Sequence, residues 1–75
     1  MKEKLLSLLE DIRPDVDFQS ETKLIDDGIL ESFDIISIVQ SVGESFGVEI
    51  DVDDLESENF NSADAILDLI EKLKR

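Results

Sequence analysis

The sequence predicts a small all-α domain: a bundle of three main helices and one short helix, with a long first loop. Apolar residues recur three and four positions apart in three segments, which is typical of amphipathic helices. A chain of 75 residues has too few apolar side chains to fill a second core, so residues 1–75 are expected to form a single domain. Because no cysteine can cross-link it, helix packing has to hold the fold.

The first helix is predicted over residues 2–12, KEKLLSLLEDI. Its apolar face consists of Leu5, Leu8, Leu9 and Ile12, and Pro14 ends the helix. Residues 14–31 show no helical period and are predicted to form a loop anchored to the core by apolar side chains: Val16, Phe18, Leu24, Ile25, Ile29 and Leu30. A loop of about 18 residues is uncommon in a compact domain unless it has a function.

Two more main helices follow. The second is predicted over roughly residues 32–46, with Gly47 at its C-terminal end and a core face of Ile35, Ile38, Val39, Val42 and Phe46. A short turn is expected around residues 53–57. Ser62 is expected to cap the last helix, whose apolar face comprises Ala63, Ile66, Ile70 and Leu73 and whose C-terminal end carries Lys72, Lys74 and Arg75.

The composition is strongly acidic. Twenty Asp and Glu residues against seven Lys and Arg give a net charge of −13, which repels nucleic acid and favours a partner with a basic surface. Hydrophobic residues make up 41% of the chain and recur with a period, so the acidic chain is expected to fold. Without a long apolar stretch or an export signal, we expect a cytoplasmic, soluble monomer with no membrane span.

The residue types offer little chemistry for an enzyme. With no His, Cys or Tyr, the usual general bases and thiol nucleophiles are missing, so the protein is not expected to be an enzyme. The acidic segment after the second helix does not fit a calcium-binding loop. Counting from Asp51 places Glu56 at the sixth position and Ser62 at the twelfth, and counting from Asp15 fails in the same way. No dedicated metal site is therefore expected.

The stretch DDGILESFDII, residues 26–36, sets a serine directly after a glycine turn and at the start of the second helix. A serine in this place is most often an N-cap. A second interpretation is that Ser32 carries a phosphodiester, because the first-turn N–H groups and the positive end of the helix dipole would stabilise a phosphate there. The residues of this stretch alone leave both interpretations open.

The segment DGILESFDIISIV resembles the acyl carrier and peptidyl carrier protein family, in which an acidic or small residue, a serine and a hydrophobic residue open the second helix. The resemblance covers nearly the whole chain, including the long first loop, FGVEI and ENFNSADAI. It implies an acyl-carrier-like bundle in which a phosphopantetheinyl transferase moves 4′-phosphopantetheine from coenzyme A onto Ser32. The thiol of that arm would carry acyl or aminoacyl intermediates as thioesters, and the protein itself would catalyse nothing.

Two departures from the family pattern bear on the partners. The commonest motif, Asp-Ser-Leu, stands here as Glu31-Ser32-Phe33, and the second helix is less acidic than in carriers of fatty-acid synthesis because Ser37, Gln40, Ser41 and Gly43 dilute its charge. LIDDGILES and ENFNS look more like stand-alone D-alanyl or peptidyl carriers, which work with adenylating ligases. The resemblance thus implies an acyl- or aminoacyl-activating ligase and downstream transferases as partners, in fatty-acid or secondary-metabolite biosynthesis.

A partner-docking surface is predicted around Ser32. Phe33 and Ile36 lie off the core face of the second helix and are expected to form an exposed apolar patch. Glu31, Asp34 and Glu44 are expected to supply acidic groups around it; alternatively, they form a solvated face, or a first-turn acid such as Asp34 favours the helix dipole. A second function also stays open, that of an unmodified acidic helical adaptor that binds a basic partner protein.

Overall fold

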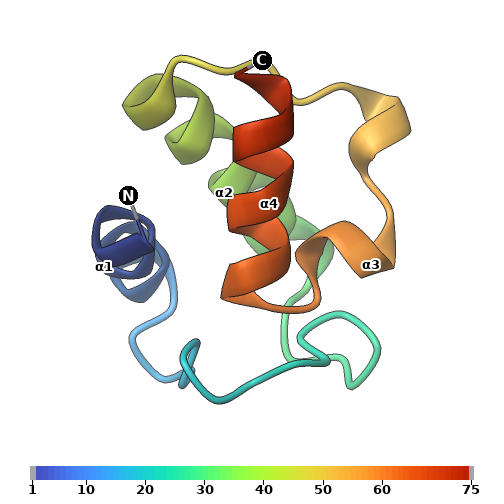
Figure 1. Cartoon of the computed structure of the whole chain (residues 1–75). Coiled ribbons are helices and arrows are strands. Elements are labelled where there is room, and N and C mark those ends of the chain that lie inside the picture. Colours follow the sequence, from blue (N-terminus) through green and yellow to red (C-terminus); the bar gives the residue numbers. More distant parts are fainter. Residues whose placement is uncertain (1, 75) are drawn as a thin grey trace.

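A computed structural model describes residues 2–74 of the chain. These residues form α1 (Lys2–Ile12), α2 (Ser32–Phe46), the 3-10 turn η1 (Val52–Asp54), α3 (Ser57–Phe60) and α4 (Ala63–Leu73), with no strand in the described range (Figure 1). The predicted all-α bundle with three main helices is confirmed. The segment expected to form a short turn around residues 53–57 contains η1 and the four-residue helix α3, which is the one short helix of the predicted bundle. None of the described helices is long and apolar enough to cross a bilayer.

The helices enclose one core. α1 packs against α2 and α4, and the short α3 packs against α4. In Figure 1, α1 is seen nearly end-on, and α4 passes in front of α2. All three predicted helix faces contribute to the core, and Leu8, Ile12, Val39 and Leu73 lie half-buried at its edge. Ile35, predicted on the core face of the second helix, is half-buried but lines a small pocket and does not pack against this core. The buried apolar side chains are Leu5, Leu9, Phe18, Leu24, Leu30, Ile38, Val42, Phe46, Phe60, Ala63, Ile66, Leu69 and Ile70.

The helix ends follow the signals in the sequence. Gly47 adopts a φ of 67°, the left-handed conformation that favours glycine, and its N–H donates to the Gly43 carbonyl at 3.0 Å. The Ser62 hydroxyl accepts a hydrogen bond of 3.0 Å from the Ala65 N–H and so caps α4, as predicted. At the C-terminal end of α2, the Lys4 ammonium donates to the Ser45 carbonyl at 2.8 Å. This bond joins α1 to the negative end of the α2 dipole.

Gly43 lies inside α2, where glycine is unfavourable because of its backbone freedom. A Cβ atom at this position would lie 3.2 Å from the carbonyl oxygen of Val48. The chain that leaves α2 thus turns back closely against the helix, and this approach accounts for a residue without a side chain.

The loop between α1 and α2 follows one edge of the molecule, below the helices in Figure 1. Its predicted apolar anchors are confirmed: Phe18, Leu24 and Leu30 are buried, and Val16, Ile25 and Ile29 pack half-buried against the core. Tight turns shape the loop, such as the one closed by a 3.0 Å bond from the Gly28 N–H to the Ile25 carbonyl. Gly28 has a φ of 71°, so this turn requires glycine. The loop therefore has a defined conformation up to the start of α2.

Candidate functional site

Ser32 is the first residue of α2 and is exposed. The N-cap position belongs to Glu31, whose backbone is extended with φ −101° and ψ 170°. Among the described residues, the hydrogen bonds at this end of α2 involve Glu31 and Asp34, and the Ser32 hydroxyl takes part in none of them. The interpretation of Ser32 as the N-cap is therefore wrong. Its hydroxyl is exposed and does not cap the helix.

The backbone around Ser32 suits an anion. The N–H groups of Ser32 and Phe33 belong to the first turn, which has no carbonyl partners within the helix. α2 has 15 residues, and the positive end of its dipole lies at Ser32. A phosphate bonded to the Ser32 oxygen would sit at this end, where its negative charge is stabilised.

An exposed apolar patch lies next to Ser32. The side chain of Phe33 is 75% exposed and that of Ile36 is 58% exposed, as predicted from their positions off the core face. Ile36 lies one turn after Ser32 and three positions after Phe33, so the three side chains are neighbours on the helix surface. Glu31 is exposed at the start of the same turn. Three of the five predicted docking residues, Glu31, Phe33 and Ile36, therefore surround the serine.

Asp34 corrects the predicted docking surface. It was expected on the exposed acidic rim, but it is buried, with 7% of its surface exposed. Its Oδ2 accepts hydrogen bonds from the Glu31 N–H at 3.0 Å and from the Arg13 guanidinium at 2.6 Å. The alternative, a first-turn acid that serves the helix itself, is the one that the structure supports. Asp34 cannot contact a partner in this position.

Arg13, which the sequence did not single out, links α1 to the start of α2. Its guanidinium donates to both carboxylate oxygens of Asp15, at 3.0 and 2.9 Å, to Asp34, and to the Ile29 carbonyl at 3.2 Å. Hydrogen bonds from Arg13 lower the pKa of Asp15, and Asp15, followed by Asp34, raises the pKa of Arg13. The partners lie up to 21 positions away in sequence, so no local pattern predicted this network.

Asn61 holds the loop before Ser32 from the other side. Its side-chain oxygen accepts hydrogen bonds from the N–H groups of Ile25 and Asp26, at 3.0 and 3.1 Å, and its amide donates to the Asp26 carboxylate at 3.1 Å. Its backbone carbonyl accepts a further bond of 2.8 Å from Leu24. Asn61 falls within ENFNSADAI, one of the segments that carry the family resemblance, although nothing in that segment indicated which residues it binds.

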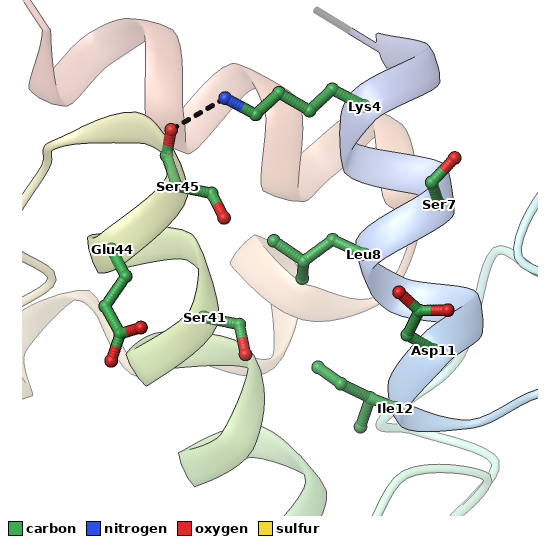
Figure 2. A pocket seen from close by; sticks show the side chains of 8 residues that line it. All are labelled: Lys4, Ser7, Leu8, Asp11, Ile12, Ser41, Glu44 and Ser45. Atoms are coloured by element: carbon green, nitrogen blue, oxygen red, sulfur yellow. Dashed lines mark hydrogen bonds between the residues drawn. The ribbon is translucent and has the colours of Figure 1, made fainter.

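Glu44 is exposed, as predicted, but it lies apart from the serine. Twelve residues, or about 18 Å at 1.5 Å per residue, separate it from Ser32 along α2. Glu44 lines an open groove of about 420 Å³ between α1 and α2, together with Ser41, Ser45 and Lys4 (Figure 2). An acid in this groove does not border the patch of Phe33 and Ile36.

A smaller pocket lies beside the first turns of α2. It has a volume of about 90 Å³ and is lined by Ile25, Ile35, Leu55, Glu56, Ser57 and Phe60. Ile35 is three positions after Ser32, so the pocket lies close to the serine. Its mostly apolar lining and small volume leave room only for a small group.

Within residues 2–74, no three carboxylates lie close enough together to hold a metal ion. The candidate site consists of the Ser32 hydroxyl, the helix start behind it and the apolar patch beside it. A scan against models of protein families matches none of them, and a search of curated proteins finds no match either.

Proposed function

We propose that this protein is a carrier that holds acyl or aminoacyl intermediates as thioesters on a 4′-phosphopantetheine arm attached to Ser32. The observation that carries the proposal is that Ser32 opens α2 with an exposed hydroxyl, while Glu31 occupies the N-cap and Asp34 bonds the cap backbone. A serine that does not serve the helix is available for modification. The resemblance of the surrounding DGILESFDIISIV to carrier proteins supports the same role.

The attachment is a phosphoryl transfer catalysed by a phosphopantetheinyl transferase. The Ser32 oxygen forms a bond to the phosphorus that bears the pantetheine arm, and the pyrophosphate bond of coenzyme A breaks. Adenosine 3′,5′-bisphosphate leaves, and the hydroxyl proton passes to a base of the transferase. The carrier contributes the hydroxyl and a helix end that stabilises the new phosphodiester.

Partners of the carrier would dock on the start of α2. Phe33 and Ile36 offer apolar contact next to the serine, and Glu31 adds negative charge. A transferase or an acyl- or aminoacyl-activating ligase with basic residues around an apolar groove would complement this surface. Because one arm has to visit several enzymes, contacts that raise association rates more than affinity suit the role. The small pocket beside Ile35 suits a short cargo better than a long acyl chain.

The proposal is tested by intact mass. After incubation with coenzyme A and a broad-specificity transferase, the wild-type chain is expected to gain one phosphopantetheine, and Ser32→Ala is expected to gain none while keeping its helical circular dichroism. Peptide mapping locates the group. Modification of Ser32→Ala at Ser37 or Ser41 would show that Ser32 is the wrong residue. No mass gain by the wild-type chain would overturn the carrier function in favour of an unmodified adaptor.

A further inference from the structure

The guanidinium of Arg13 lies where the end of α1 meets the start of α2. Its side chain is 27% exposed, and that of Asp34, which it contacts at 2.6 Å, is 10% exposed. The same guanidinium bonds both oxygens of Asp15 and the carbonyl of Ile29. One side chain thus joins the start of the first loop, the end of that loop and the first turn of α2.

The contacts of Arg13 lie on both sides of Ser32 in the sequence. Ile29 comes three residues before the serine, and Asp34 comes two residues after it. Asp34 also accepts the Glu31 N–H, so the residue directly before Ser32 belongs to the same network. Arg13 makes no hydrogen bond to Ser32. It fixes the backbone on either side, and this backbone decides where the hydroxyl points.

These contacts need an arginine. The guanidinium presents several N–H donors in a rigid plane, and here they reach two carboxylates and one carbonyl at once. A lysine has the same charge, but its compact ammonium group cannot reach all three partners at once. It could neutralise Asp34 without also holding Ile29 and Asp15. Arg13→Lys therefore keeps the positive charge of the side chain and removes the planar geometry of the guanidinium.

We propose that Arg13 is a positioning residue for the modification of Ser32: by holding Ile29 and Asp34, it keeps the serine hydroxyl in line with the phosphorus that it attacks. This inference rests on the proposed carrier function. Phe33, Ile36 and Glu31 dock the transferase and do not bond to Arg13. Loss of Arg13 is therefore expected to affect mainly the rate of the chemical step within the docked complex, because alignment of the reacting hydroxyl is more sensitive to a small backbone shift than contact through exposed side chains is.

The test measures steady-state kinetics of a broad-specificity transferase with coenzyme A and the unmodified chain as the varied substrate. Arg13→Gln is expected to lower kcat by about 10- to 100-fold, which is the loss in rate that a misplaced reacting group causes. KM is expected to stay within about threefold of the wild-type value. Arg13→Lys is expected to recover part of kcat. Hydrogen exchange at the Glu31 N–H, which bonds Asp34, is expected to accelerate in Arg13→Gln.

Gly47→Ala serves as the control for a general loss of stability. It strains the left-handed end of the same helix, 15 positions from Ser32, without contact to residues 29–34. It is expected to lower the melting temperature while leaving kcat and the Glu31 exchange rate at wild-type values. All variants are assayed well below their melting temperatures; if Arg13→Gln does not fold, Arg13→Lys carries the test.

Three results would overturn the inference. Wild-type kcat in both Arg13 variants would show that the residue does not position the serine, although the carrier function would stand. An equal loss of kcat in Gly47→Ala would show that only overall stability matters. A wild-type chain that gains no phosphopantetheine would remove the proposed function, and this inference with it.

Discussion

At the scale of single residues, Asp34 determines how α2 begins. A carboxylate at the third position of a helix commonly bonds back to the N-cap backbone, and here the same oxygen also receives a guanidinium from another element. The residue is buried because both bonds turn it inward, away from the surface that surrounds Ser32. An acid that lies two positions after Ser32 in the sequence thus belongs to the scaffold.

Replacing Asp34 is expected to destabilise the fold. Asp34→Ala removes the acceptor of the Glu31 N–H and of one guanidinium donor, both partly buried, and losing such charge-assisted bonds costs about 1–3 kcal/mol. The free energy of unfolding, measured by urea denaturation, is expected to fall by about that amount. Glu44→Ala removes an exposed acid from the same helix and is expected to stay within about 0.5 kcal/mol of wild type. Equal values for the two variants would contradict the role assigned to Asp34.

Asp15 makes the stability of the fold depend on pH in the acidic range. Hydrogen bonds from Arg13 favour the charged carboxylate and lower the pKa of Asp15 in the folded protein, so the unfolded chain takes up the proton more readily. The resulting stabilisation is complete above the usual pKa of aspartate, about 3.9. It is lost as the pH falls through the lower pKa of the folded state.

The pH dependence can be measured with Asp15→Asn. At about pH 6 this variant is expected to melt below wild type, because it loses the 2.9 Å ion pair with Arg13. Removing the charge of Asp15 also relieves repulsion from other acids, but salt screens charges that lie more than about 8–10 Å away, so this gain is smaller. The difference in melting temperature is expected to close as the pH falls below about 4. Asp17→Asn, which removes a neighbouring exposed acid, provides the control. A difference that persists unchanged to low pH would exclude the ion pair as its cause.

At the scale of elements, α2 has two different sides. Ile38, Val42 and Phe46 anchor it in the core, while Phe33 and Ile36 face solvent in its first two turns. The loop before it is held by Arg13 on one side and by Asn61 on the other, so the backbone that leads into the exposed first turn is fixed. This division lets α2 combine its structural role with the proposed docking role.

Charge reversal at the start of α2 is expected to slow the modification of Ser32. Glu31→Lys opposes a basic transferase surface, and the loss in rate is expected to reach about tenfold at low ionic strength and to shrink as salt is added. Phe33→Ala is expected to weaken docking with little dependence on salt, because it removes apolar contact. Modification rates at several salt concentrations measure both effects.

Glu71→Lys on α4 is the matched control for this prediction. It makes the same change in net charge at an exposed position of another helix, and it is expected to have a much smaller effect. If reversals on both helices slow the modification equally, net charge alone steers partners, and the docking surface at Phe33 and Ile36 is not supported.

At the scale of the whole molecule, a net charge of −13 on 75 residues opposes compaction. Lys2 and Arg13 form ion pairs with Asp64 and Asp34, which lie far from them in the sequence. Many other carboxylates are exposed at the surface. Moderate salt or millimolar divalent cations are therefore expected to raise the melting temperature by screening. A gain of ~1 kcal/mol corresponds to about 4–8 °C in a domain of this size.

Thermal melts at increasing concentrations of sodium chloride and magnesium chloride test this expectation, with calorimetry to detect binding. A gradual rise without a stoichiometric endpoint fits screening. Lower melting temperatures in salt would contradict the role of repulsion. Saturable, high-affinity binding of calcium in a parallel calorimetric titration with calcium chloride would mean that the acidic segments form a metal site.

The sequence by itself determined the three main helices, most of the core and the place of Ser32. These features depend on residues close together in the chain: apolar side chains at helical spacing, Gly47 after α2 and Ser62 before α4. The exposure of Phe33 and Ile36 followed from the same periodicity, because the helix wheel fixes which side chains turn away from the core.

Only the tertiary structure decided the roles of Asp34, Arg13 and Asn61. Their hydrogen bonds join residues 21 and 36 positions apart, and a local pattern cannot show which distant donor will meet an acid. It also decided that Glu31 and not Ser32 is the N-cap of α2, since the loop fixes where the backbone enters the helix. Periodicity is a property of the chain, whereas the pairing of polar groups depends on how the helices and loops come together.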